Sequence, residues 1–433
     1  MDSSDSGIFK LASVGSYLDA LSSITDEMTL RERSNLIFLD KCLHEIWGLG
    51  QNVLLNWSPS SEGVALLVVP HYAVASYSAK ARTAAAGNGS PESDESRTGR
   101  PSEDFLRSLL TGRRRLDPER LVKVARLLGV DIMQIPLRHA IVDSPAQQQI
   151  IEQMIKRYSI TYVPSRAVAL FDIVGFSLLS PFEQMTQLNS LSYSLNSAQS
   201  KLSLKKIGID FSRSTTGDGF YVWNRRLSLE ANINLYHFMH LVLADNAIAR
   251  SKGLANTVPR LRACFHVGGS YEFHQAEGLN PTLYNYIVGD VTVELARMIE
   301  RALPDQILVG EFRAEMPLLE GDQAERATLD SIDFVTRATR SVEQLTGLEL
   351  SGERVELIKC YLTGTKLDDG RFTVRRIIVN DKHGISRHVY NAKANIYRHN
   401  ATPILLGIED RIIGTVAIRR DRSEHLLRPL PPQ

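Results

Sequence analysis

Two aspartates, each placed where an apolar run meets a glycine, constrain this chain more than any other feature of its sequence. Asp172 closes the run Val-Ala-Leu-Phe-Asp and is followed by Gly175, and Asp218 lies in a Gly-Asp-Gly triplet. Strand-like runs that meet glycine place a side chain at a strand end, where the backbone is open to the close approach of a ligand. The pattern therefore predicts two carboxylates at strand ends, in a setting suited to metal and phosphate.

The second aspartate is also expected in a hairpin. The short apolar runs Ile207–Phe211 and Phe220–Trp223 flank the Gly-Asp-Gly turn, as in a β-hairpin. If the strand ending at Asp172 pairs beside this hairpin, the two aspartates meet at one edge of a sheet. Two neighbouring carboxylates repel, and a pair of divalent cations relieves the repulsion. Taken singly, each aspartate also suits a plain turn, because Asp-Gly is a common hairpin connection.

Length and composition indicate an ordinary globular protein with two or three domains. The chain has 433 residues and a formal net charge of +1, so nothing global favours nucleic acid or an anionic membrane. Cys42, Cys264 and Cys360 are far apart in apolar surroundings, which argues against a disulfide framework or a zinc site. No apolar run is long enough to span a bilayer, and the acidic start does not resemble a signal peptide. We expect a cytoplasmic protein without membrane contact.

Composition and periodicity divide the chain into six segments. A linker is expected where Ala, Gly, Ser, Pro, Glu and Asp dominate, because such a stretch cannot bury enough apolar area to become ordered. The segments are a small N-terminal α/β region (1–83), a flexible linker (84–102), a helical segment (103–140), a connecting helix (141–162), the main domain (163–400), and C-terminal strands with a tail (401–433). In the first segment, a helix around 36–47 precedes a hairpin of strands at 53–57 and 64–70.

The helical segment 103–140 resembles the second half of a phage-repressor-type helix-turn-helix over about thirty residues. Asp117 is a good N-cap, Pro118 suits the first helical position, and Gly129 suits the helix end. One interpretation is DNA contact through three consecutive arginines. The other is a helical hairpin that packs on the main domain or on a partner, with these arginines solvated. The arginines are Arg113, Arg114 and Arg115.

The main domain is predicted to have an α+β fold with the element order β-α-β-β-α-β. Helical periodicity covers Pro181–Ser200 and about Leu229–Lys252, and strand patterns cover Arg260–Gly268 and the residues before Gly289. This order predicts a ferredoxin-like antiparallel sheet with helices packed on one face.

Four motifs in this domain resemble, in order and spacing, the class III nucleotidyl cyclase domain. The resemblance covers about residues 163–301, roughly a third of the chain. The motifs are Phe171-Asp-Ile-Val-Gly-Phe-Ser177, Thr216-Gly-Asp-Gly-Phe220, Arg262-Ala-Cys-Phe-His-Val-Gly268, and Gly289-Asp290 followed by Arg297-Met298.

The resemblance implies a two-metal active site. Asp172 and Asp218 would hold two Mg²⁺ or Mn²⁺ ions, with the carbonyl of Ile173 as a further ligand. Backbone N–H groups from Val174 to Ser177, a stretch that includes Phe176, would cradle the phosphates at the start of the following helix. Arg297 matches the family's transition-state arginine, which reaches into the partner subunit. A head-to-tail homodimer with two composite active sites follows from this match.

Three positions depart from the purine cyclases of this family. Ser214 stands where adenylyl cyclases have lysine and guanylyl cyclases have glutamate, and Tyr286 stands where adenylyl cyclases often have aspartate. Val293 aligns with the family's transition-state asparagine, so that role is vacant, shifted or taken by Glu294.

This combination most resembles the bacterial pyrimidine cyclases of the Pycsar antiphage system. The resemblance implies conversion of UTP to cyclic UMP and diphosphate, as a second messenger that activates a separate effector protein. The alternatives are a cytidylate or purine cyclase, and a DNA-binding regulator whose cyclase-like domain senses nucleotide.

Several polar residues are candidates for contacts with the nucleotide. Tyr286 or Tyr284 would fill the space left by a small pyrimidine, and Ser214 or Arg213 would hydrogen-bond the base. Three lysines are candidates for binding the triphosphate, although each also suits a solvated surface position. They are Lys366, Lys382 and Lys393.

Overall fold

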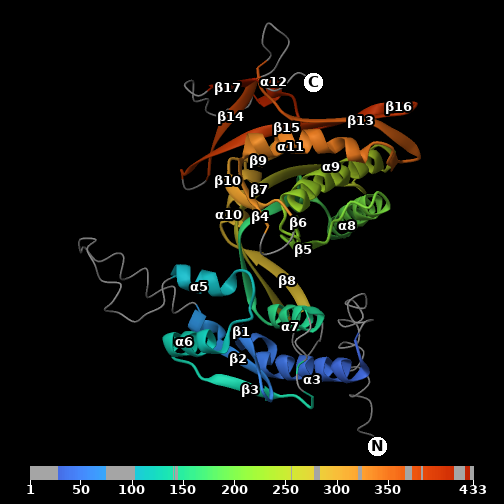
Figure 1. The fold of residues 1–433 in the computed structure, drawn as a ribbon. Helices are drawn as coiled ribbons and strands as arrows, with labels where there is room; N and C mark the ends of the chain where they lie inside the picture. The colour runs from blue at the N-terminus through green and yellow to red at the C-terminus, as the bar shows by residue number, and fades with distance from the viewer. Residues whose placement is uncertain are drawn as a thin grey trace, which may run out of the picture. The chain divides into compact units, whose positions relative to one another are not determined.

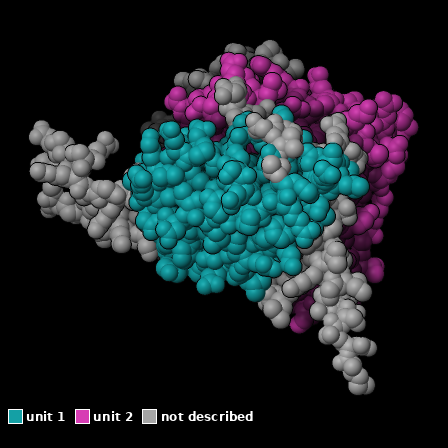
Figure 2. Space-filling view, turned by 60° about the horizontal axis from the view of Figure 1, so that its bottom comes forward, with its two compact units in different colours: residues 1–163, 271–287 teal, residues 164–270, 288–433 magenta. Residues whose placement is uncertain are grey.

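The computed structural model describes most of the chain, which forms two compact units. The described residues are 28–74, 103–139, 141, 145–254, 256–276, 283–319, 324–365, 373–381, 384–413 and 425–429. Unit 1 comprises residues 1–163 and 271–287, and unit 2 comprises residues 164–270 and 288–433 (Figure 2). The predicted linker 84–102 lies outside the described residues. None of the described helices is long and apolar enough to cross a membrane.

Unit 1 contains a three-stranded antiparallel sheet of order β1-β2-β3. Its first helix begins with a capping box between Thr29 and Glu32 and ends at Gly48 in the left-handed conformation, as favoured at helix ends. The predicted first helix and hairpin are confirmed. The elements are α3 (Leu30–Trp47), η1 (Gly48–Gly50), β1 (Asn52–Ser60), β2 (Gly63–Pro70), α5 (Glu103–Leu110), α6 (Pro118–Leu128), β3 (Ile132–Pro136) and α7 (Pro145–Arg157) (Figure 1).

Alternation along β1 and β2 explains why helices cover both faces of this sheet. Leu54 and Leu66 belong to one apolar cluster with α3 and α7. Their neighbours Val53, Leu55 and Leu67 belong to another cluster with α5 and α6. Because successive side chains of a strand point to opposite faces, one short hairpin supports two helical layers.

Both interpretations of Arg114, DNA contact and a solvated surface position, are wrong, because this side chain is fully buried. Its guanidinium donates to the carbonyl oxygens of Leu109, Leu110 and Ile160. The last carbonyl groups of a helix have no partner within it, and Arg114 supplies donors at the end of α5. Its pKa is lowered to about 10, mainly by burial. Of the three arginines, Arg113 is exposed.

Unit 2 is built on a large mixed sheet of order β12-β13-β15-β9-β7-β4-β6-β5. The predicted order of elements is present as β4-α8-β5-β6-α9-β7. The prediction of a purely antiparallel sheet is wrong, because β7 and β9 pair in parallel. The elements of this part of the chain are β4 (Ile160–Ile173), η2 (Phe176–Leu178), α8 (Pro181–Leu204), β5 (Phe211–Thr215), β6 (Gly219–Asn224), α9 (Leu229–Lys252), β7 (Leu261–Ala276), β8 (Leu283–Val288) and α10 (Asp290–Ile299). Of these, β4, β7 and β8 each include residues that belong to unit 1.

The second half of unit 2 extends this sheet. β14 and β16 pair with β15, and β17 pairs with β14. The elements are β9 (Ile307–Gly310), β10 (Arg313–Pro317), β11 (Arg326–Asp330), α11 (Ser331–Ser341), η3 (Val342–Leu345), β12 (Glu349–Leu350), β13 (Glu353–Leu362), β14 (Thr373–Asn380), β15 (Ser386–Arg398), β16 (Ala401–Leu406), α12 (Asp410–Ile413) and β17 (His425–Pro429).

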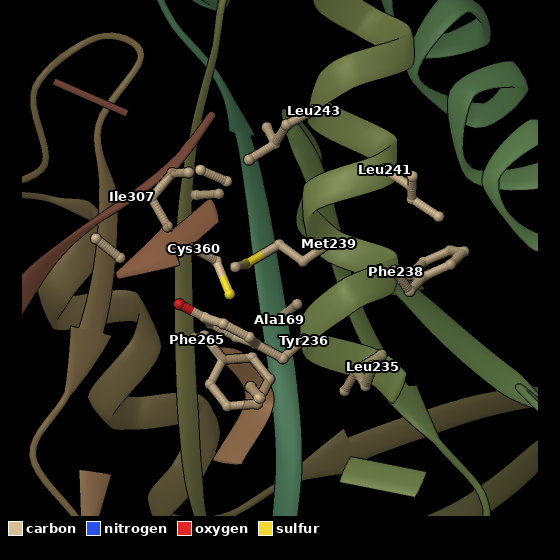
Figure 3. Packing of buried hydrophobic residues seen from close by; sticks show 14 of the residues in the cluster. Ala169, Leu235, Tyr236, Phe238, Met239, Leu241, Leu243, Phe265, Ile307 and Cys360 are labelled. Atoms are coloured by element: carbon tan, nitrogen blue, oxygen red, sulfur yellow. The ribbon is translucent and has the colours of Figure 1, made fainter. Parts of the chain in front are cut away.

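Helices α8, α9 and α11 lie together against one face of the sheet (Figure 1). α9 is buried on nearly every side, between the sheet and α8, and its buried residues include asparagines and histidines as well as apolar side chains. Tyr236 and Met239 point toward Ala169 and Phe265 of the central strands, whereas Leu241 points away from them (Figure 3). The prediction of helices on one face is wrong for α10, since its buried side chains lie outside this cluster.

The structure of unit 2 differs from two of the predictions about its strands. The first strand of the hairpin is β5, not Ile207–Phe211, because Ile207 and Ile209 are buried in the core as part of the connection after α8. Buried apolar residues in this loop therefore gave the same sequence pattern as a strand. Within the segment 401–433, where strands and a tail were predicted, β16 and β17 are strands, but residues 410–413 form the short helix α12.

Candidate functional site

The pairing of β4 with β6 brings the two predicted aspartates to one edge of the sheet. Asp172 lies opposite Gly219 in this antiparallel ladder. The N–H of Ile173 donates to the carbonyl oxygen of Asp218 at 3.0 Å, and the N–H of Thr216 closes the hairpin turn on the carbonyl of Gly219 at 3.0 Å. The turn that carries one carboxylate is thus held by the strand that carries the other.

Gly219 is required by the close approach of these two strands. A Cβ atom built at this position would lie 1.9 Å from the carbonyl oxygen of Phe171. No side chain fits in that space, so the second glycine of the Gly-Asp-Gly triplet sets the distance between β4 and the turn.

The Asp172 carboxyl group is nearly buried, with 6% of the residue exposed. Burial raises its pKa, the ion pair with Arg262 opposes this shift, and the neighbouring Asp218 carboxyl raises the pKa further through charge repulsion and a side-chain contact. The carboxyl of Asp218 also accepts a hydrogen bond from the Thr216 hydroxyl at 3.2 Å. Each added negative charge at this edge is therefore costly without a cation.

Arg262 is a site residue that the sequence analysis did not single out for any role. Its Nε donates to Asp172 Oδ2 at 2.6 Å, and its Nη1 donates to the carbonyl oxygen of Ala302 at 3.0 Å. It lies on β7, next to β4 in the sheet. The signal was present in the Arg262–Gly268 motif, but only the sheet order shows that this strand faces Asp172.

The donor set fits hard divalent cations. Two facing carboxylates, of which one oxygen is already used by Arg262, leave carboxylate oxygens for Mg²⁺ or Mn²⁺. The main chain of Ile173 lies directly beside Asp218. Within the described ranges, no cluster of three or more His, Cys, Asp and Glu side chains could hold a metal. The cation ligands that the described residues provide at this site are therefore the carboxylates of Asp172 and Asp218 and the neighbouring main-chain oxygens.

The loop after β4 differs in part from the predicted phosphate cradle. Gly175 has a positive φ of 72° and precedes the short helix η2. The N–H of Val174 was predicted to bind a phosphate. It is not available for this, because it donates to the carbonyl oxygen of Arg260 at 2.9 Å. Phe176 is partly buried against the core, and Ser177 is exposed.

Arg297 lies on α10 among other charged side chains of unit 2. Its Nη1 donates to Glu300 at 3.2 Å, and its Nε lies 3.9 Å from Asp381. Val293 is half exposed. Glu294 accepts from Arg387 at 2.7 Å, so its carboxylate is engaged in an ion pair.

The two base-reading candidates belong to different units. Ser214 lies on β5 of unit 2, opposite Tyr221, and is partly exposed. Tyr286 belongs to unit 1 and stacks on Phe273, with ring centroids 5.6 Å apart. Arg213, the other candidate for the base, donates to the Ser192 hydroxyl at 2.7 Å. The side chain of Tyr284 lies outside the described part of the chain.

Of the candidate lysines, only Lys393 lies within the described residues. It is nearly buried on β15 and forms an ion pair with Glu409. Binding a triphosphate would require this pair to open. Lys366 and Lys382 lie outside the described ranges.

No family model matches the chain, and no curated protein matches it. Similar solved structures include the guanylate cyclase domain of RhGC from Catenaria anguillulae in complex with GTP, at 12% identity over 55% of this chain and 100% of that chain, with a TM-score of 0.31. The adenylyl cyclase CyaB from P. aeruginosa has 12% identity over 56% and 97% of the two chains, with a TM-score of 0.28. Both similarities are distant, so the function proposed below rests on the residues of this chain.

Proposed function

We propose that this chain is a nucleotidyl cyclase that converts UTP to 3′,5′-cyclic UMP and diphosphate. The observation that carries the proposal is the carboxylate pair of Asp172, which is buried, and Asp218, which is partly exposed, held together by the register of β4 and β6. Two carboxylates side by side, one of them buried, repel each other, and a partly open site of this kind suits the binding of cations.

The reaction requires the ribose 3′-hydroxyl to lose its proton and attack the α-phosphorus. A bond forms between the 3′-oxygen and the α-phosphorus, and the bond from that phosphorus to the bridging oxygen breaks, releasing diphosphate. Two divalent cations, when bound, lower the pKa of the hydroxyl and neutralise the leaving group. Asp172 and Asp218 would hold these cations. Arg262 holds one oxygen of Asp172 in place through its hydrogen bond.

Arg297 would stabilise the charge that develops on the phosphoryl oxygens, as a guanidinium does in phosphoryl transfer. Because it would act in the site of the partner subunit, the active enzyme would be a homodimer. Ser214 and Tyr286 lack the charges that purine cyclases carry at these positions, which supports a pyrimidine base. The cyclic product would act as a second messenger for a separate effector in antiphage defence.

The proposal is tested with the purified protein, each of the four ribonucleoside triphosphates, and Mn²⁺ or Mg²⁺, with products separated by chromatography. We expect cyclic UMP from the unchanged protein and none after addition of EDTA. Asp172→Ala and Asp218→Ala should each reduce the rate at least about 100-fold, because each removes a cation ligand. Asp210→Ala removes an exposed carboxylate that pairs with Arg225 and should leave the rate unchanged.

Each alternative gives a different result in this assay. Cyclic CMP, cyclic AMP or cyclic GMP as the main product would support the proposed cyclase reaction but contradict UTP as the substrate. No cyclic product from any triphosphate would contradict the proposed reaction, as would full activity of both aspartate variants.

A further inference from the structure

Four charged side chains of unit 2, one of them Arg297, are linked by three ion pairs, and helix α10 completes the ring. Glu294 accepts from Arg387 Nε at 2.7 Å, and Arg387 Nη1 donates to Asp381 Oδ2 at 2.8 Å. The same oxygen of Asp381 lies 3.9 Å from Arg297 Nε. Since Glu294 and Arg297 are neighbours on α10, the ring begins and ends on the same helix. Its charges alternate and cancel.

Asp381 is the buried member of this ring. Its side chain is 2% exposed, whereas that of Arg297 is 23% exposed. The other carboxylate oxygen, Oδ1, accepts from the N–H of Ile385, just before β15, at 2.9 Å. Arg301, one helical turn after Arg297, donates to the carbonyl oxygen of Asn380 at 2.9 Å. Asp381 is thus held by described partners, and the segment from α10 to Arg301 contacts residues 380 and 381 through two arginines.

The contacts of Arg297 leave part of its guanidinium group for a ligand. Nε faces Asp381 and Nη1 donates to Glu300. Among the described residues, no hydrogen-bond acceptor is found for Nη2. A free arginine side chain samples many rotamers, and binding a ligand must restrict them at a cost in entropy. A buried carboxylate beside Nε reduces that cost before any substrate arrives, because the head group is already oriented.

We propose that Asp381 is a positioning residue for Arg297. The buried carboxylate, kept in place by Arg387 and the N–H of Ile385, orients the guanidinium so that its remaining N–H groups point to the phosphoryl oxygens during cyclisation. This inference rests on the proposed function, because it assigns Arg297 to the transition state. It also makes a prediction about Arg297 itself that does not depend on catalysis.

The test uses Asp381→Asn, which keeps an oxygen for the Ile385 N–H and removes the charge. We expect kcat to fall about 10- to 100-fold, the scale of a misplaced catalytic group, with KM changed less than about threefold. In an Arg297→Ala background the same substitution should lower kcat no further. Asp245→Asn is the matched control, because Asp245 is a nearly buried carboxylate paired with Lys201 at 2.6 Å and should leave kcat unchanged.

A second readout follows the Nε–H resonance of Arg297 in protein labelled with ¹⁵N-arginine, assigned by its loss in Arg297→Lys. We expect Asp381→Asn to shift this resonance and Asp245→Asn to leave it in place. An unmoved resonance, or an equal loss of kcat with and without Arg297, would overturn the positioning role. If the unchanged protein makes no cyclic nucleotide, the proposed function fails, and the resonance still decides whether Asp381 orients Arg297.

Discussion

The guanidinium of Arg114 binds three main-chain carbonyl groups within unit 1. Those of Leu109 and Leu110 lie at the end of α5, and that of Ile160 begins β4. Its main-chain N–H also donates to Glu152 at 2.5 Å. A single buried side chain therefore joins a helix end to a strand, which is a structural role.

Replacing Arg114 by alanine should destabilise the protein by about 3 kcal/mol or more, because several buried carbonyl groups lose their donor at once. Arg113→Ala, at the exposed neighbouring position, should change the free energy of unfolding by less than about 0.5 kcal/mol. Denaturation with urea measures both. Equal effects of the two substitutions would contradict the structural role of Arg114.

At the scale of elements, the turn between β5 and β6 depends on two glycines in different ways. Gly219 lies where a Cβ would meet the carbonyl oxygen of Phe171 at 1.9 Å, whereas Gly217 has a positive φ of 98° and open space around it. Gly219→Ala should therefore cost at least about 3 kcal/mol of stability, because β4 and β6 must separate. Gly217→Ala should cost about 1 to 2 kcal/mol, from backbone strain alone.

Urea denaturation of the two variants distinguishes these expectations. A larger loss of stability for Gly217→Ala than for Gly219→Ala would show that strand separation is not the main cost. Because Gly219 lies opposite Asp172, its substitution should also weaken the binding of Mn²⁺, measured by calorimetry. Gly112→Ala, at a position with positive φ and open space in unit 1, provides a control for strain away from the site.

The long elements were predictable because their apolar residues recur at helical spacing and their ends carry clear signals. α8 begins at a capping box of Ser180 and Glu183, and α9 begins at Ser228. The position of β5 was not predictable in this way. Ile207 and Ile209 are buried without belonging to a strand, and periodicity cannot distinguish these cases.

For the site, the sequence predicted the pairing of Asp172 and Asp218 because each is next to a turn that local chemistry specifies. It did not reveal the contact of Arg262 with Asp172, or that of Asp381 with Arg297. Those contacts join residues far apart in the chain and depend on strand order and side-chain direction. The loss of Val174 as a phosphate donor has the same origin, since its partner Arg260 precedes a distant strand.

At the scale of the whole molecule, the proposed reaction needs residues from two copies of the chain. Asp172 and Asp218 would come from one subunit, and Arg297 from its partner. In a symmetric dimer every contact occurs twice, so two equivalent composite sites would form. An inactive variant from one side of the site should then rescue an inactive variant from the other side.

Co-expression of Asp172→Ala and Arg297→Ala chains with different affinity tags tests this arrangement. Random pairing makes half of the dimers mixed, and each mixed dimer has one intact site, so the mixture should regain about a quarter of the normal activity. Asp172→Ala with Asp218→Ala is the matched control. Both substitutions fall on the same side of the site, so every site keeps a defect and no activity should return. Failure of the first pair alongside an active unchanged protein would mean that Arg297 acts within its own subunit or not at all.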